Sequence, residues 1–533
     1  MARQSPSVST APRSRAVTVS SRCRHMIVSR PLNQRGLSKT MQDGTRLAAV
    51  DLGSNSFRLE IGQLDHGLIR RTDYLKETVR QGGELDAQRN LRPQAMQRGW
   101  DCLARFAERL AGFKKHQVRA VATQTLREAR NRDEFLSQAR KILGFPIDVI
   151  PGREEARLIY LGVAHFLPDN QERRLVIDVG GRSTEMILGQ HLQAQTMESW
   201  RVGSVSWSSR YFPDGLFTEQ AFERAEVAAK AVLEEALPAF GRDQWDCAYG
   251  SSGTVNAVAD ALQASGWDAE LITQEALDWL LDRLLRAQSA DRIRIEGLKD
   301  DRRAVIGGGV SVLRAIFSLL DIKAMRPAEG ALRHGVLYDL LDRQDDETDL
   351  RTRTVDHLMR KYRVDVKQAA RVSRTAQFLL EQAPPQADLP RLQRKLGWAA
   401  QLHEIGSHVS HQEYHKHGAY LLDHADAPGF SMDELHRLSQ LVLGHRGKLR
   451  KMEPWYADPV FMRQLLCLRL AVILCHAHRD PELEGTVLLE QGSEVWLRVS
   501  SNWARHFPQS RYLLEEECAA WNKTPWPWTL QTS

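Results

Sequence analysis

The sequence predicts an α/β protein in which two similar domains are followed by a helical region and a small C-terminal α/β module. The first observation is a repeated turn, because Asp51-Leu52-Gly53-Ser54-Asn55-Ser56 returns as Asp178-Val179-Gly180-Gly181-Arg182-Ser183. The second is an alternation of strand-like and helical patterns around both copies, which is typical of α/β domains. The third is a change near Asp345 to a helical region rich in His and Arg. The expected domains are residues 46–158, 159–345, 346–482 and 483–533.

In the first domain, each element follows from its apolar pattern. The repeated turn lies between the apolar runs Leu47–Val50 and Phe57–Ile61, which predict strand, tight turn, strand. Gly, Ser and Asn in such a turn permit unusual backbone angles and direct N–H groups toward an anion. The chain then predicts a strand at 68–75, a helix at 93–113, a strand at 118–122, a helix at 133–143, a strand at 147–150 and a helix from Gly152.

The second domain repeats this order. It predicts strands between about 174 and 201, helices between about 218 and 237, a strand that ends in Tyr249–Thr254 and a helix at 255–263. Gly307-Gly308-Gly309 interrupt an apolar helical pattern, which predicts close packing or a helix start there. A helix at 329–341 closes the domain. Beyond the helical region we expect strands at 487–489 and 495–499 and a final helix at 512–521.

Composition indicates an ordinary globular protein of 533 residues, 42% hydrophobic and 26% charged. No apolar run approaches the roughly 18 residues of a membrane span, and six cysteines without CxxC spacing favour a reduced, cytoplasmic protein. The net charge is +6, but residues 1–42 hold seven Arg, one Lys and no acid, which leaves 6 − 8 = −2 for the rest. Residues 1–45 are expected to be a disordered basic tail, or a mis-assigned start with translation from Met41. The basic tail therefore gives no support for nucleic-acid binding, and peripheral membrane association stays open.

Several motifs resemble a known family. Duplicated Asp–Gly–Ser turns and a third Gly-Ser-Gly-Thr turn before a helix resemble the actin-like (ribonuclease H-like) fold of the sugar kinase/actin superfamily. Five motifs in order strongly resemble the exopolyphosphatase/guanosine pentaphosphate phosphohydrolase (Ppx/GppA) family: 51–57, 123–127, 154–159, 178–185 and 250–254. The resemblance continues through 329–338 and 402–406, and it covers roughly residues 46–533.

The resemblance implies a catalytic carboxylate just before Ala-Arg-Leu-Ile, which here is Glu155. Adjacent residues of a helix point about 100° apart, so only one of Glu154 and Glu155 is expected to face the cleft. Asp178 and Glu185 match acidic positions that serve a divalent metal, which we expect to be Mg²⁺ because it prefers oxygen ligands. Asp51 is the equivalent of Asp178, with a metal contact or a turn-stabilising role as alternatives. Arg127 is expected to contribute to catalysis by clamping a phosphate.

The turns supply the expected phosphate contacts. The candidates are Gly53, Ser54, Asn55, Ser56, Gly180, Gly181, Arg182, Ser183, Thr184, Gly253 and Thr254. The alternative for the glycines is a purely structural role in tight turns. Arg182 departs from the family, which commonly has a small residue there, so it either donates to the anion or points outward.

The helical region resembles an HD-type phosphohydrolase domain, but His403-Glu404 stands where that fold has a His-Asp pair. We therefore expect a structural role, with formation of a homodimer implied by the resemblance only. Lys416, Arg446, Lys448, Arg450 and Lys451 are candidates for guiding a polyanion, with an ordinary solvated surface as the alternative.

The predicted function is an Mg²⁺-dependent exopolyphosphatase that removes terminal phosphate from inorganic polyphosphate, with Glu155 as general base. The alternative substrate is guanosine pentaphosphate, hydrolysed at the same site. The full-length C-terminal half and the segment at 414–422 favour the polymer. A third hypothesis, a sensor that binds without turnover, conflicts with an intact Glu155.

Overall fold

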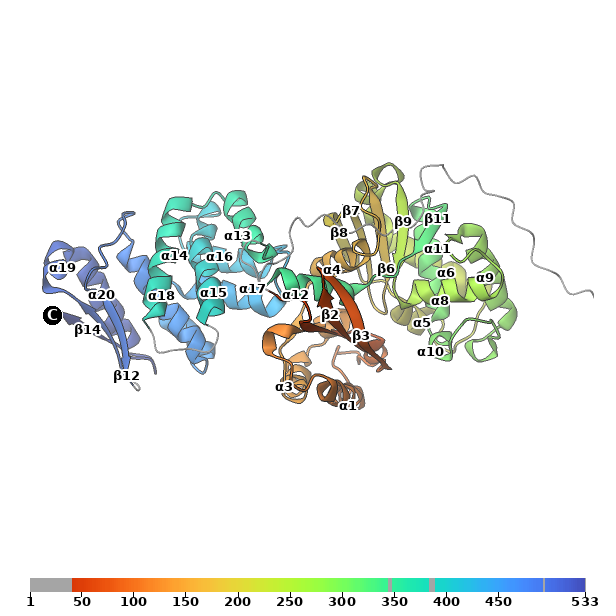
Figure 1. Cartoon of the computed structure of the whole chain (residues 1–533), viewed down its shortest axis with the longest axis horizontal. Helices are drawn as coiled ribbons and strands as arrows, with labels where there is room; N and C mark the ends of the chain where they lie inside the picture. The colour runs from red at the N-terminus through yellow and green to blue at the C-terminus, as the bar shows by residue number, and fades with distance from the viewer. Residues whose placement is uncertain (1–40, 344–347, 383–388, 492–493, 533) are drawn as a thin grey trace, which may run out of the picture. The chain divides into compact units, whose positions relative to one another are not determined.

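The computed structural model describes residues 41–343, 348–382, 389–491 and 494–532 (Figure 1). The expected basic tail at 1–45 therefore lies almost wholly outside the described residues. The chain divides into two compact units, one ending at Thr348 and the other beginning at Asp349.

The first unit holds two sheets, and the first sheet has the strand order β3-β2-β1-β4-β5. Its strands are β1 (Arg46–Leu52), β2 (Ser56–Asp65), β3 (Leu68–Thr78), β4 (Val118–Ala122) and β5 (Ile147–Val149). The helices of this lobe are α1 (Pro93–Arg109), α2 (Gln124–Glu128) and α3 (Arg132–Leu143). β1, β2 and β3 pair antiparallel, whereas β4 and β5 continue the sheet in parallel.

The second sheet has the order β10-β11-β9-β6-β7-β8. Its strands are β6 (Arg174–Val179), β7 (Thr184–Gln190), β8 (Gln193–Trp200), β9 (Cys247–Ser251), β10 (Ile272–Thr273) and β11 (Ala324–Pro327). The helices of this lobe are α5 (Ser204–Tyr211), α6 (Glu219–Leu233), α7 (Leu237–Phe240), α8 (Gly253–Ala264), α9 (Gln274–Ala287), α10 (Asp300–Arg303) and α11 (Ile306–Leu319).

The two sheets are copies of one plan. In each, three antiparallel strands are extended by two parallel strands, and the second sheet adds β10 as an antiparallel edge. Strands β1, β2, β3 and β4 therefore correspond to β6, β7, β8 and β9. The registers agree as well: Asp51 lies opposite Arg58, and Asp178 lies opposite Glu185. The duplication predicted from the repeated turn is therefore confirmed. The structure also confirms an actin-like fold with two lobes, each built on a mixed sheet.

Two crossing helices, α4 (Gly152–Ala164) and α12 (Leu332–Asp342), connect the lobes near the centre of the first unit (Figure 1). Their crossing depends on glycines. A Cβ at Gly335 would lie 1.8 Å from the carbonyl oxygen of Leu158, and one at Gly162 would lie 2.2 Å from that of Ala331. No other residue type permits this approach, so backbone contact fixes the distance between the helices.

The three glycines at 307–309 begin α11 rather than break it. A Cβ at Gly308 would lie 2.5 Å from the backbone nitrogen of Ser208, and one at Gly309 would lie 2.6 Å from Cγ2 of Thr254. The predicted close packing is thus confirmed, and it brings α11 against both α5 and the first turn of α8.

The second unit is mainly helical. Its helices are α13 (Leu350–Lys361), α14 (Val366–Glu381), α15 (Leu389–Leu402), α16 (Tyr414–Asp423), α17 (Met432–Gly444), α18 (Pro459–Leu474), α19 (Ser501–His506) and α20 (Pro508–Trp521). A small sheet, β12-β13-β14, consists of Val487–Gln491, Glu494–Val499 and Thr529–Thr532. The apolar core runs without a break from α14 to Leu497 and Trp521, so the sheet and the helices share one core.

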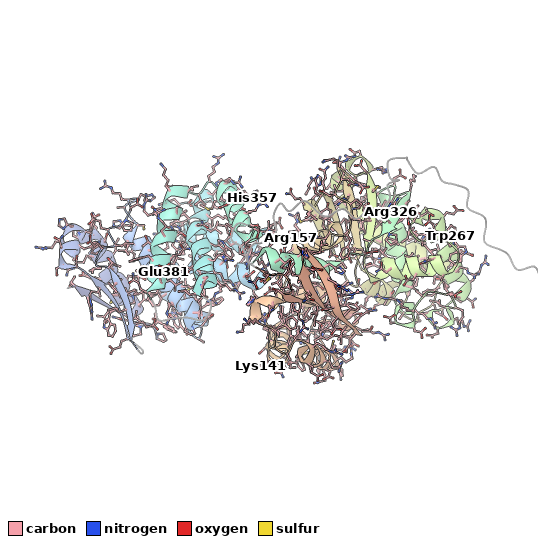
Figure 2. All side chains as sticks on the ribbon, in the orientation of Figure 1. Lys141, Arg157, Trp267, Arg326, His357 and Glu381 are labelled. Carbon is pink, nitrogen blue, oxygen red and sulfur yellow. The ribbon has the colours of Figure 1, made fainter. Side chains whose placement is uncertain are left out.

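Lys141 of α3 and Glu381 of α14 are among the charged side chains that lie exposed on the helices (Figure 2). Among the described helices, none has the length and apolar character that crossing a membrane requires.

Candidate active site

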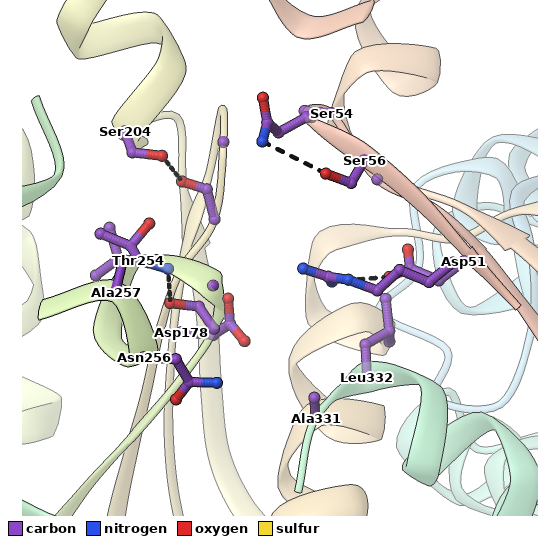
Figure 3. Close-up of a pocket in the computed structure, with 18 of the residues that line it drawn as sticks. Asp51, Ser54, Ser56, Asp178, Ser204, Thr254, Asn256, Ala257, Ala331 and Leu332 are labelled. Atoms are coloured by element: carbon purple, nitrogen blue, oxygen red, sulfur yellow. Dashed lines mark hydrogen bonds and ion pairs between the residues drawn. The ribbon is translucent and has the colours of Figure 1, made fainter. Parts of the chain in front are cut away.

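A pocket of about 340 Å³ opens in the first unit, where the two sheets face each other. Asp51 and Ser56 line one wall, and Asp178 and Thr254 line the opposite wall (Figure 3). Because β1 and β6 are equivalent strands, the two copies of the repeated turn meet across this pocket.

Most of the predicted site residues line the pocket. Those in its lining are Asp51, Gly53, Ser54, Asn55, Ser56, Glu155, Asp178, Gly180, Gly181, Ser183, Gly253 and Thr254. Four others, Arg127, Arg182, Thr184 and Glu185, are not in the lining. The structure therefore brings the turns together as expected and places these four side chains behind them.

The two repeated turns have the same internal geometry. A Cβ at Gly53 would lie 2.9 Å from the carbonyl oxygen of Ser56, and one at Gly180 would lie 3.0 Å from that of Ser183. The turns also touch each other, because a Cβ at Gly181 would lie 3.1 Å from Cβ of Ser54. These glycines thus keep backbone close to backbone, which leaves N–H groups near the space that an anion would take.

The third turn precedes α8. Ser252 has φ of 125°, a strained value for a residue with a Cβ, and its hydroxyl accepts from the backbone N–H groups of Thr254 and Val255 at 3.1 Å each. Gly253 and Thr254 line the pocket at the first turn of this 12-residue helix. A helix N-terminus carries a partial positive charge, so it favours a phosphate at this wall.

Glu155 lies in the first turn of α4, held by Arg127 behind the pocket. Arg127 Nη1 donates to Glu155 Oε2 at 2.6 Å and to the carbonyl oxygen of Ile150 at 2.9 Å. Burial raises the pKa of Glu155, while the charge of Arg127 and its hydrogen bond oppose the rise. A base with a raised pKa takes a proton from water more readily. Arg127 therefore contacts the carboxylate rather than lining the phosphate space.

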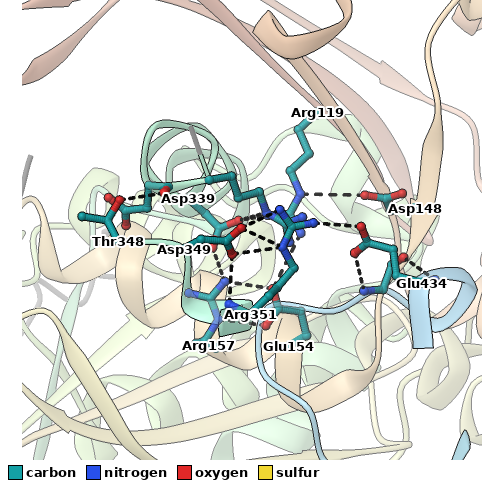
Figure 4. A network of polar contacts seen from close by, with 12 residues as sticks. Arg119, Asp148, Glu154, Arg157, Asp339, Thr348, Asp349, Arg351 and Glu434 are labelled. Atoms are coloured by element: carbon teal, nitrogen blue, oxygen red, sulfur yellow. Dashed lines mark hydrogen bonds and ion pairs between the residues drawn. The ribbon is translucent and has the colours of Figure 1, made fainter. Parts of the chain in front are cut away.

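Glu154 points away from the pocket into a buried ionic network (Figure 4). It pairs with Arg157 at 2.8 Å and with Arg119 at 3.6 Å, and Asp339 contacts both of these arginines. The three arginines around Asp339, of which Arg343 is the third, lower the pKa of its carboxyl strongly against the effect of burial. As expected, only one of the two adjacent glutamates faces the pocket. Glu154 belongs instead to this buried network.

Acidic groups gather on the second copy of the turn. Burial first, then the charge of Glu155, raises the pKa of Asp178 to about 7. Behind it, Glu185 is 1% exposed and accepts from the hydroxyl of Ser199 at 2.8 Å. Burial and the charges of Glu155 and Asp178 raise the pKa of Glu185 well above its usual value. These carboxyl groups repel one another, so a cation near Asp178 would stabilise their ionised forms.

The residues present fit a divalent cation that is held partly by other ligands. Within the described part of the chain, no three or more His, Cys, Asp and Glu side chains are arranged to enclose a metal on their own. Oδ1 of Asp51, however, is buried without a hydrogen-bond partner. Mg²⁺ usually keeps several waters and takes one or two carboxylates together with substrate phosphates, which this donor set can provide.

Two of the predicted phosphate contacts are occupied elsewhere. The hydroxyl of Thr184 donates to the carbonyl oxygen of Val202 at 2.7 Å. Arg182 donates to Glu128 at 2.6 Å and to the carbonyl oxygen of Gly82. The geometry therefore gives no support to phosphate contacts for either side chain, because a loop carbonyl just after β8 holds the first and an ion pair holds the second.

The pocket is also basic, and most of its cations lie outside the motifs that predicted the site. Arg58, Lys76, Lys299, Arg302 and Arg333 line it, together with Tyr74. A signal was available on β3, where Tyr74 and Lys76 stand two residues apart and so share one face of the strand. The remaining cations come from segments far apart in the sequence, and their convergence requires the folded chain.

In the second unit the clustered histidines make structural contacts. His403 and His445 are 1% and 2% exposed, and each donates from Nδ1 to a backbone carbonyl three residues earlier. Burial lowers the pKa of both imidazoles, so they are neutral at pH 7. Elsewhere in this unit Arg351 pairs with Asp349 and Glu434 (Figure 4).

Comparison with known proteins relates both units to one family. A model described as the Ppx/GppA phosphatase family matches residues 61–344, and one described as Ppx/GppA phosphatase, domain III, matches residues 350–518. Relatives called guanosine-5'-triphosphate,3'-diphosphate pyrophosphatase are 37% identical in Photobacterium profundum and 39% identical in Vibrio cholerae. Each alignment covers 91% of this chain and 98% of the relative.

Solved structures agree on the fold. One described as an exopolyphosphatase-like protein aligns with a TM-score of 0.51 and 25% identity, and it covers 56% of this chain and 98% of its own. An exopolyphosphatase from Cytophaga hutchinsonii aligns with a TM-score of 0.50 and 23% identity over the same shares.

Proposed function

Since this chain belongs to the Ppx/GppA phosphatase family and is a hydrolase of phosphoanhydride bonds, we propose that it removes the terminal phosphate of guanosine pentaphosphate. The family resemblance and the enzyme class predicted from the sequence are thereby confirmed. The substrate names of relatives aligned over 91% of the chain support the guanosine nucleotide. The sequence alone favoured polyphosphate, with guanosine pentaphosphate as the alternative. The relatives reverse this order, and guanosine pentaphosphate becomes the first candidate.

The observation that carries this proposal is the distribution of charge along the pocket. At its inner end the turns and the N-terminus of α8, which carries a partial positive charge, lie beside Glu155 and Asp178. At its outer end Lys76 and Lys299, whose side chains are 28% and 73% exposed, supply a second set of cationic groups. A nucleotide with phosphates at both the 5' and 3' positions fits this arrangement, with the 5' chain in the turns and the 3' diphosphate against the cations.

In the proposed mechanism, Glu155 orients a water molecule in line with the terminal phosphorus and takes its proton. Arg127 fixes the carboxylate through the 2.6 Å hydrogen bond. The turn N–H groups donate to the phosphoryl oxygens as negative charge shifts toward the leaving group. Asp178 and Asp51, with Glu185 behind them, are the residues that would hold Mg²⁺, which when bound neutralises charge on the phosphate oxygens.

Inorganic polyphosphate remains the second candidate substrate. It has the same terminal bond, and a solved neighbour at 25% identity is described as an exopolyphosphatase-like protein. The HD-like character of the helical region, the role of the C-terminal strands as a separate module, the homodimer and the cytoplasmic location remain proposals from the sequence.

Phosphate release from guanosine pentaphosphate, long-chain polyphosphate and ATP, each with Mg²⁺ and with chelator, tests the proposal. We expect the highest kcat/KM for guanosine pentaphosphate. Substituting Lys76→Ala should weaken that preference, because it removes a cation from the outer pocket and leaves the turns intact. A higher kcat/KM for polyphosphate would reverse the order of the substrates, and no release from any of the three would contradict hydrolysis.

A further inference from the structure

Arg182 joins the two lobes at the edge of the pocket. It belongs to the second phosphate turn, in the lobe built on β6, whereas both of its partners belong to the lobe built on β1. Its Nη2 and Nε donate to Oε2 of Glu128 at 2.6 and 3.2 Å, and its Nη1 donates to the carbonyl oxygen of Gly82. The backbone N–H of Gly82 in turn donates to Ser54 of the first phosphate turn at 2.7 Å. One side chain thus connects both turns.

From Glu128 a line of hydrogen bonds runs along α2 to Glu155. Gln124 Nε2 donates to Oε1 of Glu128 at 2.6 Å. The other end of the same amide, Oε1 of Gln124, accepts from Nη2 and Nε of Arg127 at 2.6 and 2.9 Å. Arg127 Nη1 then donates to Glu155 at 2.6 Å. Gln124 and Arg127 thus each contact the preceding side chain through one polar group and the following side chain through another.

We propose that Arg182 is a positioning residue that transmits the approach of the two phosphate turns, through Glu128, Gln124 and Arg127, to the carboxylate of Glu155. The proposal rests on the proposed function, because it assigns Glu155 the task of activating water. When the turns close on a phosphate chain, Arg182 holds Glu128 in place. The amide of Gln124 and the guanidinium of Arg127 then each have one allowed orientation, and Glu155 points at the attacking water.

The geometry supports transmission along this line rather than a set of independent contacts. Gln124 is 5% exposed, and its amide is used at both ends, so it cannot turn over without losing contacts to Glu128 and Arg127 together. Burial raises the pKa of Glu128, but the hydrogen bond from Gln124 and the charge of Arg182 outweigh it. Glu128 therefore stays ionised and accepts from both neighbours. Charged hydrogen bonds of this kind are directional and strong.

The direct alternative for Arg182 is contact with substrate phosphate, and kinetics separates the two roles. A phosphate ligand that binds substrate and transition state alike raises KM when it is removed. A positioning residue lowers kcat, because a misplaced base slows the chemical step while the binding groups stay in place.

The test compares Arg182→Ala, Arg182→Lys, Gln124→Leu and the double variant Arg182→Ala/Gln124→Leu. Arg201→Ala is the matched control, since Arg201 lies 3.9 Å from Glu128 but is 70% exposed. For Arg182→Ala we expect kcat to fall about tenfold with KM within about twofold, and Arg182→Lys should recover part of kcat. Arg201→Ala should match the wild type. The double variant should be no slower than Gln124→Leu, because losing the Gln124 amide already breaks the connection between Glu128 and Arg127.

Several results would overturn the proposal. These are a rise in KM at unchanged kcat for Arg182→Ala, or multiplied losses in the double variant. Amide hydrogen exchange of α2 supplies a readout without turnover: Arg182→Ala should speed exchange there, and an unchanged rate contradicts the coupling. If the wild type releases no phosphate, the proposed function fails, and the exchange measurement still decides whether Arg182 orders α2.

Discussion

Substituting Gly335→Ala at the crossing of α4 and α12 should slow catalysis although the site lies outside the pocket lining. The new Cβ would lie 1.8 Å from the carbonyl oxygen of Leu158, whereas real Cβ contacts are essentially never closer than 3.0 Å. One helix must therefore move by at least 3.0 − 1.8 = 1.2 Å. Because the obstruction is backbone, rotation of a side chain cannot relieve it.

The movement has a consequence for the reaction, because α4 carries Glu155. A displacement of about 1 Å in a catalytic group can cost on the order of 100-fold in rate. We therefore expect kcat to fall at least tenfold. The free energy of unfolding should also fall, since overpacking costs about 1–3 kcal/mol and exceeds the ~1 kcal/mol that Ala gains over Gly in a helix.

The assay is steady-state hydrolysis together with a thermal melt of the same preparation. Gly397→Ala is the matched control, because Gly397 also lies inside a helix but its Cβ would meet the flexible amide tip of Gln377 at 2.7 Å. That amide can move aside, so the melting temperature and kcat should stay near the wild type. If Gly335→Ala melts at or above the wild-type temperature with full activity, the crossing does not hold Glu155 in place.

Three further predictions follow from the site. Glu155→Gln should lower kcat by roughly 10²–10⁴, whereas Glu154→Gln should chiefly lower the melting temperature; equal losses of kcat in both variants would contradict the assignment of the base. Burial lowers the pKa of His165 to about 4 from 6.5, so the unfolded chain binds the proton first. The free energy of unfolding should then drop by up to about 3 kcal/mol as the pH falls from 6.5 to 4. His165→Phe, which keeps the stacking on Tyr338, should show a smaller drop in urea unfolding. Finally, chelation should abolish phosphate release, and Mg²⁺ should raise the melting temperature of the wild type more than that of Asp178→Asn.

The repeated turn made the fold predictable. A copied Asp–Gly–Ser sequence between apolar runs implies two copies of one strand–turn–strand unit, and the equivalence of β1 with β6 follows from it. Residues whose backbone makes the site were therefore found from the sequence, among them Gly53 and Gly180. Their role depends on local conformation, which neighbouring residues determine.

Residues that act through distant partners were harder to place. Arg127 was expected to contact phosphate, and Arg182 either to contact it or to point outward, because a guanidinium beside a phosphate turn suggests such a contact. Their partners Glu155 and Glu128 lie 28 and 54 positions away. Nothing in the sequence shows that these arginines form ion pairs with the two acids instead of contacting phosphate. The same limit applies to Glu154, whose burial depends on Arg119 and Asp339 from other elements.

The two copies of the turn differ in the residue that pairs with their aspartate on the neighbouring strand. Opposite Asp51 stands Arg58, which contacts it at 3.3 Å and opposes the effect of burial on its pKa. Opposite Asp178 stands Glu185, a second acid, and the charge of Glu155 adds to the repulsion. The first copy therefore has a counter-charge in direct contact, while at the second copy the charges of Arg58 and Arg127 only partly oppose the rise in the pKa of Asp178 and Glu185. A divalent cation held between Asp178 and Asp51 would relieve that repulsion, so the second copy gains more from the cation than the first. The outer end of the pocket, where Lys76 and Lys299 lie, would then face the phosphates of the substrate.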